Sequence, residues 1–107
     1  MKTLDTMAAV ETFVAQPFAV LVAKTHTCST CKQIIEHLHT KIPELEHVPT
    51  AQVFLEDFEA FRGHYVVFSV PTVLVFSDGR ELMRESRFIR TDVIRRALLA
   101  YLDHESA

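Results

Sequence analysis

Apolar residues recur along the chain in two spacings, one typical of helices and one typical of buried strands. Spacings of three and four residues predict amphipathic helices, and short continuous runs rich in β-branched residues predict strands covered on both faces. The helical spacing predicts four helices, at 6–16, from the cysteine motif at 28 to Pro43, at 57–65 and from Thr91 to about Asp103. The continuous runs predict strands at 18–23, 51–56 and 70–76.

A fourth strand, at 80–86, follows from the turn that precedes it. Ser77, Asp78 and Gly79 separate two extended segments, and an Asp-Gly pair in that position favours a tight antiparallel hairpin. The earlier order of strand, helix and strand favours a parallel pairing instead. The chain therefore predicts a single domain over 1–107 of the α/β class. We expect a mixed four-stranded sheet, half parallel and half antiparallel hairpin, with helices on both faces.

Composition and net charge limit the classes of partner that the protein is expected to bind. The 107 residues are 49% hydrophobic and 23% charged, with a net charge of −3 and no basic stripe, so nucleic acid is not expected as a partner. The longest uncharged apolar run, "PFAVLVA", falls far short of the roughly 20 residues that cross a bilayer. Asp5 and Glu11 interrupt the apolar residues near the start, which argues against a signal peptide. We therefore expect a cytoplasmic monomer that does not contact a membrane.

Both cysteines of the chain lie in "THTCSTCK", at the junction of a predicted strand and helix. At the start of a helix, free backbone N–H groups and the helix dipole stabilise a thiolate, here at Cys28. Cys31 lies one turn further on, where it can attack a mixed disulfide formed at Cys28. His26 and Lys32 flank the pair. Their positive charge either favours the thiolate further or is simply solvated.

Two structural interpretations of the cysteines stand beside the redox one. A structural zinc site needs four ligands, whereas the chain has two cysteines, and His37 and His39 would face different sides of their helix. We therefore expect no metal. Two inert buried thiols are the plainer alternative. His47, His64 and His104 are expected at the surface.

The segments "FAVLVAKTHTCSTCK" and "VPTVLVFSDG", in this order and separation, resemble the thioredoxin family over nearly the whole chain. The resemblance implies a thioredoxin fold, with Cys28 as nucleophile and Cys31 as the resolving cysteine. It also implies that Pro71 follows a cis peptide bond and faces the two sulfurs. The substrate contacts that go with these roles are expected at Thr27, Ser29, Thr30, Val70 and Thr72.

The chain departs from the family's namesake at several of these positions. The namesake has a tryptophan before the first cysteine and Gly-Pro between the two, where this chain has Thr27, Ser29 and Thr30. It also has a buried aspartate six residues before the first cysteine, where this chain has Val22, and its lysine partner is missing from 50–55. An apolar core without this acid avoids an unpaired buried charge. Without this aspartate, we expect the resolving step, in which Cys31 attacks the mixed disulfide, to be slower.

The resemblance implies a thiol–disulfide oxidoreductase that reduces disulfides in proteins and needs no cofactor. A reductase or a low-molecular-weight thiol would be its electron donor. One alternative is a non-catalytic module that holds an extended peptide in the groove beside Pro71. The other is a glutaredoxin-like thiol transferase, which is weakened because no Gly-Gly-x-Asp follows the hairpin.

Overall fold

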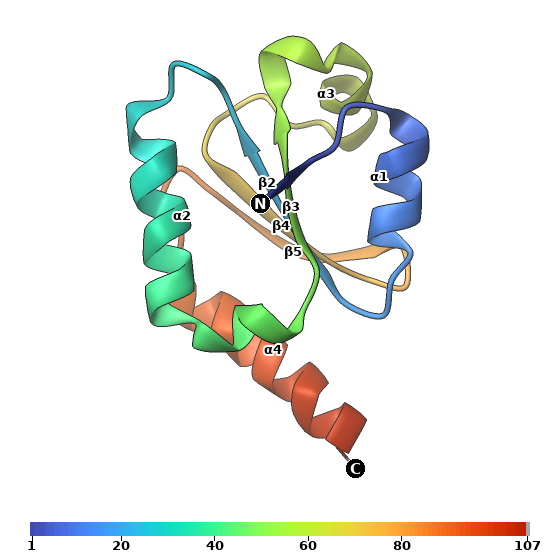
Figure 1. Cartoon of the computed structure of the whole chain (residues 1–107), viewed down its shortest axis with the longest axis vertical. Coiled ribbons are helices and arrows are strands. Elements are labelled where there is room, and N and C mark those ends of the chain that lie inside the picture. Colours follow the sequence, from blue (N-terminus) through green and yellow to red (C-terminus); the bar gives the residue numbers. More distant parts are fainter. Residues whose placement is uncertain (107) are drawn as a thin grey trace.

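A computed structural model describes residues 1–106 and contains a five-stranded mixed sheet. The strands are β1 (Lys2–Thr3), β2 (Ala19–Lys24), β3 (Thr50–Phe54), β4 (Thr72–Ser77) and β5 (Arg80–Ser86). They are ordered β1-β3-β2-β4-β5 (Figure 1). β1, β3 and β2 run parallel to one another, β4 runs antiparallel to β2, and β5 runs antiparallel to β4. The parallel half and the hairpin half agree with the expectation from the sequence, as does the α/β fold class.

The expected count of four strands was wrong, because β1 adds a fifth at the edge of the sheet. Lys2 and Thr3 pair with Ala51 and Gln52 of β3, and the side-chain amide of Gln52 donates to the Thr3 hydroxyl at 2.9 Å. Both β1 residues are exposed. Two exposed polar residues have no apolar pattern, so hydrophobic periodicity has nothing to detect here.

Within residues 1–106, four α-helices and two short 3₁₀ helices flank the sheet. The α-helices are α1 (Met7–Val14), α2 (Ser29–Lys41), α3 (Glu59–Tyr65) and α4 (Thr91–Ser106), and the 3₁₀ helices are η1 (Pro43–His47) and η2 (Leu55–Asp57). The hydroxyl of Thr6 caps α1 by accepting a hydrogen bond from the Ala9 N–H at 3.1 Å. Pro43 begins η1 just after α2 ends, because proline cannot continue the helical hydrogen bonds.

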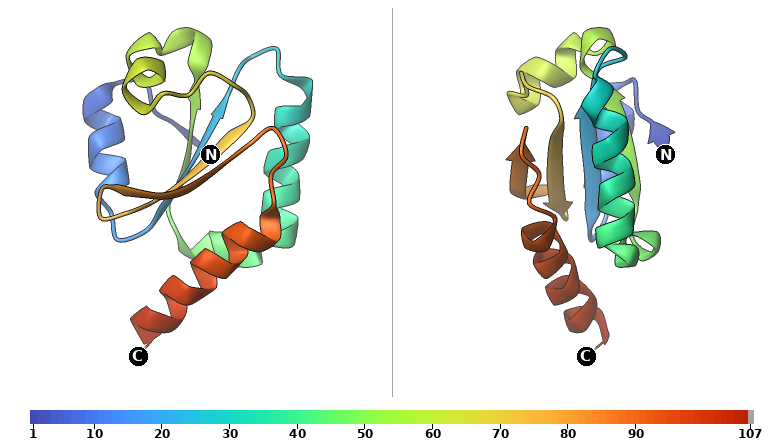
Figure 2. Two further views of the ribbon diagram at one scale, coloured as in Figure 1. Left: turned by 180° about the vertical axis from the view of Figure 1, so that it is seen from behind. Right: turned by 90° about the vertical axis from the view of Figure 1, so that its left-hand side faces the viewer.

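The sheet separates two apolar cores, one on each face, because the strand residues alternate in direction. One core joins β-strand residues such as Leu21 and Leu74 to α1 and α3. The other joins Val20, Val22 and Val73 to α2 and α4. Figure 1 shows α1 and α2 on opposite sides of the strands, and Figure 2 shows α4 continuing beyond the end of the sheet. Helices on both faces were expected from the sequence.

Strand boundaries differ from the prediction at two places near the cysteines. The strand expected over 70–76 begins at Thr72, so Pro71 precedes the hydrogen-bonded ladder to which it has no N–H to donate. The strand expected over 51–56 gives way at Leu55 to η2. The hairpin occurs as expected, with φ of 51° at Asp78 and 84° at Gly79, the left-handed values that its tight turn requires. Within residues 1–106, no helix is long and apolar enough to cross a membrane.

Candidate functional site

The cysteine pair lies where the chain leaves β2 and enters α2, at one end of the sheet. Figure 1 places this loop and α3 at the same end. The N–H of Cys28 donates to the carbonyl of Thr25 at 3.3 Å, and the N–H of Cys31 donates to the carbonyl of Cys28 at 3.3 Å. Cys28 and Cys31 form a disulfide, with their Cα atoms 5.4 Å apart. The two residues expected to act together are thus already bonded.

The two sulfurs differ in their surroundings. Cys28 is the N-cap residue of α2 and is partly exposed, whereas Cys31 is buried, with 2% of its surface accessible. No acidic residue lies in the first turn of α2, so the N–H groups there face no competing charge from the helix. The Thr30 hydroxyl lies 3.5 Å from the Cys28 sulfur. These features allow an incoming group to reach Cys28 and stabilise a thiolate there.

Val70 and Pro71 approach this loop from β4. The Val70–Pro71 peptide bond is cis. Thr72 stands opposite Ala23 in the antiparallel pair of β2 and β4, so Pro71 lies beside the residues that leave β2 toward the cysteines. The carbonyl of Pro71 accepts a hydrogen bond from the Arg87 N–H at 2.8 Å. Pro71 is thereby fixed on both sides, by the start of β4 and by the segment after β5.

The remaining expected contact residues differ in accessibility. Thr27, Ser29 and Thr30 are exposed around Cys28, and Val70 is partly exposed. Thr72 is 1% exposed, and its hydroxyl donates to the Ser69 carbonyl at 2.7 Å. Because this exposure includes the main chain and Thr72 is paired with Ala23 and Ser86 on its two sides, the expected contact of Thr72 with a substrate does not fit the structure.

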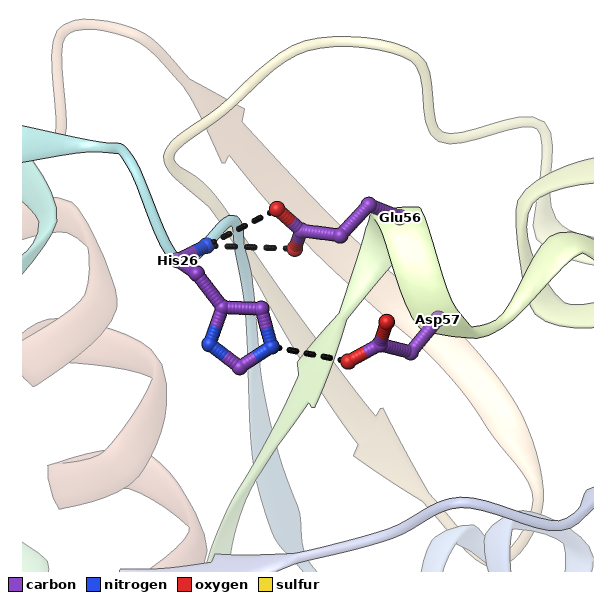
Figure 3. A group of neighbouring side chains, drawn as sticks. All are labelled: His26, Glu56 and Asp57. Atoms are coloured by element: carbon purple, nitrogen blue, oxygen red, sulfur yellow. Dashed lines mark hydrogen bonds and ion pairs between the residues drawn. The ribbon is translucent and has the colours of Figure 1, made fainter.

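A carboxylate and imidazole group braces the loop before Cys28 (Figure 3). The N–H of His26 donates to both oxygens of Glu56, at 3.1 and 3.0 Å, and the His26 Nε2 lies 2.7 Å from an Asp57 oxygen. The His26 ring also stacks on Phe54, with centroids 3.9 Å apart and planes 6° apart. His26 is thus held by η2 and the end of β3. From the sequence, the positive charge of His26 either favours the Cys28 thiolate or is simply solvated. In the structure, the His26 ring contacts Asp57.

The same three residues bring oxygen and nitrogen ligand atoms within 4.8 Å of one another. All three are exposed, and their contacts with each other already account for their positions. We therefore interpret the group as a brace for the loop.

Sequence reasoning missed Phe54, Glu56 and Asp57. A signal for them was present, because "ED" comes one residue after a strand parallel to β2, and the carboxyl ends of parallel strands meet at the same edge of a sheet. His47, His64 and His104 are exposed, as expected.

Comparison with known proteins agrees with this geometry. No family model matches the chain. The thioredoxin-like protein YdfQ of Bacillus subtilis is 25% identical over 99 residues, which cover 92% of this chain and 88% of that protein. A thioredoxin of Chlamydia trachomatis is 33% identical over 57 residues, 53% of this chain and 56% of that one. The structure of Fasciola hepatica thioredoxin matches with a TM-score of 0.78 and 23% identity, covering 94% of this chain and 99% of that one.

Proposed function

We propose that this chain, which is similar to thioredoxin-like proteins, is a thiol–disulfide oxidoreductase that reduces disulfides in proteins through Cys28 and Cys31. The observation that carries the proposal is the unequal exposure of the two bonded sulfurs, with Cys28 partly exposed at a helix start and Cys31 2% exposed. A substrate sulfur can reach the first cysteine only. The second is placed to react with what is bound to the first.

In the first step, the Cys28 thiolate of the reduced protein attacks one sulfur of the substrate disulfide. A Cys28–substrate disulfide forms, and the other substrate sulfur leaves as a thiolate. The N–H groups at the start of α2 favour the thiolate form of Cys28 at neutral pH. The segment of Val70 and Pro71, of which Val70 is partly exposed, is proposed to hold the substrate chain next to the sulfur.

In the second step, Cys31 loses its proton and attacks the Cys28 sulfur. The Cys28–Cys31 disulfide forms, and the second substrate sulfur leaves as a thiolate, so that the substrate gains two electrons and the protein dithiol loses two. The disulfide in the structure is the product of this step. A reductase or a low-molecular-weight thiol returns the pair to the dithiol.

We place this exchange in the cytoplasm, with the chain acting as a single domain and a monomer. A reducing compartment keeps structural disulfides rare, and close cysteine pairs there are more often catalytic.

Reduction of insulin by dithiothreitol with catalytic amounts of the protein tests the proposal. The wild type is expected to speed precipitation of the insulin B chain, and Cys28→Ser to fall to the uncatalysed rate. Thr40→Ala, on the exposed side of α2, is the matched control and should keep the wild-type rate. Equal rates for wild type and Cys28→Ser would contradict the proposal that the protein catalyses reduction through Cys28, and would leave the peptide-binding alternative.

A further inference from the structure

A hollow of about 170 Å³ opens beside the loop that carries the cysteines. It is lined by Thr25, Leu55, Glu56, Arg62, Phe68 and Val70. Two of these residues connect it to the site, since Thr25 accepts the Cys28 N–H and Val70 precedes Pro71. A chain that runs past Val70 and Pro71 toward Cys28 would pass the mouth of this hollow.

Arg62 of α3 lines the hollow, and its Nε–H is buried and finds no acceptor within residues 1–106. Three other arginines among residues 1–106 each bind a carboxylate: Arg84, Arg90 and Arg95. A buried donor without an acceptor lowers the stability of the fold, so an unpaired guanidinium at a site calls for a ligand that supplies the acceptor.

Within residues 1–106, no other residue of the hollow forms an ion pair with Arg62. Glu56 lines the hollow too and keeps its negative charge, but both of its oxygens are turned to the His26 N–H. The Phe68 ring lies 5.8 Å from the Arg62 guanidinium carbon, and 67% of Phe68 is exposed. Because Phe68 is so exposed, its ring can shift without losing much buried apolar area. The hollow thus combines an apolar wall with an arginine that has no carboxylate partner within residues 1–106.

We propose that this hollow binds the carboxylate side chain of an acidic residue close to the reactive cysteine of a peptide substrate, and that Arg62 determines this specificity. The inference rests on the proposed function. The guanidinium supplies N–H donors in a planar fork that fits a carboxylate, and Phe68 packs against the methylene groups of the same side chain. A peptide is the chosen source because an extended chain beside Val70 places a side chain at the hollow and a cysteine at Cys28.

Matched peptides test the specificity. Each peptide carries one disulfide and differs only in a Glu, a Gln or a Lys beside the cysteine, and kcat/KM for its reduction is measured at low and high salt. The Glu peptide is expected to react about tenfold faster than the Gln peptide at low salt. The Lys peptide should be slowest, and added salt should shrink the differences.

Variants of two arginines then show whether Arg62 causes the preference for the Glu peptide. Arg62→Met is expected to lower kcat/KM for the Glu peptide about tenfold, to the value for the Gln peptide, because it removes the charged contact. Arg62→Lys should keep part of the preference. Arg80→Met is the control, because Arg80 pairs with Ser77 at the hairpin end of β5, opposite the end where Thr72 pairs with Ser86. The Arg80→Met variant should therefore react with all three peptides at the wild-type rates.

Three results would overturn the inference. The first is a Glu peptide that reacts no faster than the Gln peptide, and the second is a preference that survives in Arg62→Met. The third is a preference limited to a small disulfide with carboxylates, such as dithiodiglycolate, which would contradict the peptide source. In each case the Gln peptide is still reduced and the proposed function stands. Failure of the wild type to reduce any peptide would overturn the proposed function and this inference together.

Discussion

Val22 lies opposite Val73 in the antiparallel pair of β2 and β4, and both side chains are buried, at 1% and 0% exposure. On the other side of β2, Val22 lies opposite Gln52 of β3. Its side chain belongs to the core that α2 and α4 cover. The position where the family's namesake has a buried acid is therefore apolar in this chain. Val22 offers no base to Cys31, so in the proposed mechanism the Cys31 proton goes to water, to the leaving thiolate or to a group such as Lys24.

Replacing Val22 by Asp should destabilise the fold and speed the resolving step. A carboxylate buried among valines would be unpaired, so the free energy of unfolding is expected to fall by about 2–4 kcal/mol in a urea titration. In the protein that stays folded, the new carboxylate can accept the Cys31 proton. Rapid mixing of the mixed disulfide should then show faster release of the substrate.

Val22→Asn is the control for this change, because it matches aspartate in size and lacks the charge. It should destabilise the fold without speeding the release. A resolving step in folded Val22→Asp that is no faster than in the wild type would show that another group already serves as base.

The Glu85–Arg90 pair should contribute stability that depends on pH. Glu85 is 7% exposed, and the Arg90 guanidinium donates to both of its carboxylate oxygens. These hydrogen bonds hold the pKa of Glu85 below its ordinary value of 4.5. Because the pKa is lowered by folding, the contribution is complete above pH 4.5 and is lost as the pH falls through the lowered value.

Glu85→Gln should therefore lower the free energy of unfolding by about 1–2 kcal/mol at pH 7 and make the loss of stability below pH 4.5 shallower. Urea titrations between pH 7 and pH 3 measure both effects. Glu36→Gln, an exposed position on α2, should leave the whole curve within about 0.5 kcal/mol of the wild type. Parallel curves for Glu85→Gln and wild type below pH 4.5 would contradict the account.

The Glu56 carboxylate should hold the loop before Cys28 in place. Glu56→Ala removes the acceptor of the His26 N–H, so exchange of that amide hydrogen with solvent should speed up at least about tenfold. Amide exchange followed by NMR gives the rate for this single residue. Asp57→Asn, which weakens the contact to the His26 ring but leaves the main-chain bond, should change it far less. Unchanged exchange in Glu56→Ala would mean that Glu56 does not restrain the loop.

The sequence predicted the parts of the fold that have a strong apolar pattern. β2 and α2 were expected close to their observed bounds, because Val20, Leu21 and Val22 form a continuous apolar run and Leu38 and Ile42 recur at helical spacing. β1 was missed, since it consists of two exposed residues whose pairing depends on β3.

The site was predicted only in part. The cysteine pair and the Asp-Gly hairpin are local signals, readable from adjacent residues. The brace on His26 comes from η2, about thirty positions later, and the hollow depends on how Arg62 and Phe68 meet. Such contacts follow from the packing of separate elements, which neither periodicity nor spacing describes.

The most direct test of the account is to trap the covalent complex between the protein and a disulfide peptide. Cys31→Ser, reduced and then mixed with the peptide, is expected to accumulate a mixed disulfide with one peptide per protein, and peptide mapping by mass spectrometry should place it on Cys28. Cys28→Ser should accumulate far less, because its remaining thiol at residue 31 is buried, with 2% exposure. Equal trapping in the two variants, or trapping mainly through Cys31, would contradict the assignment of Cys28 as the attacking thiol.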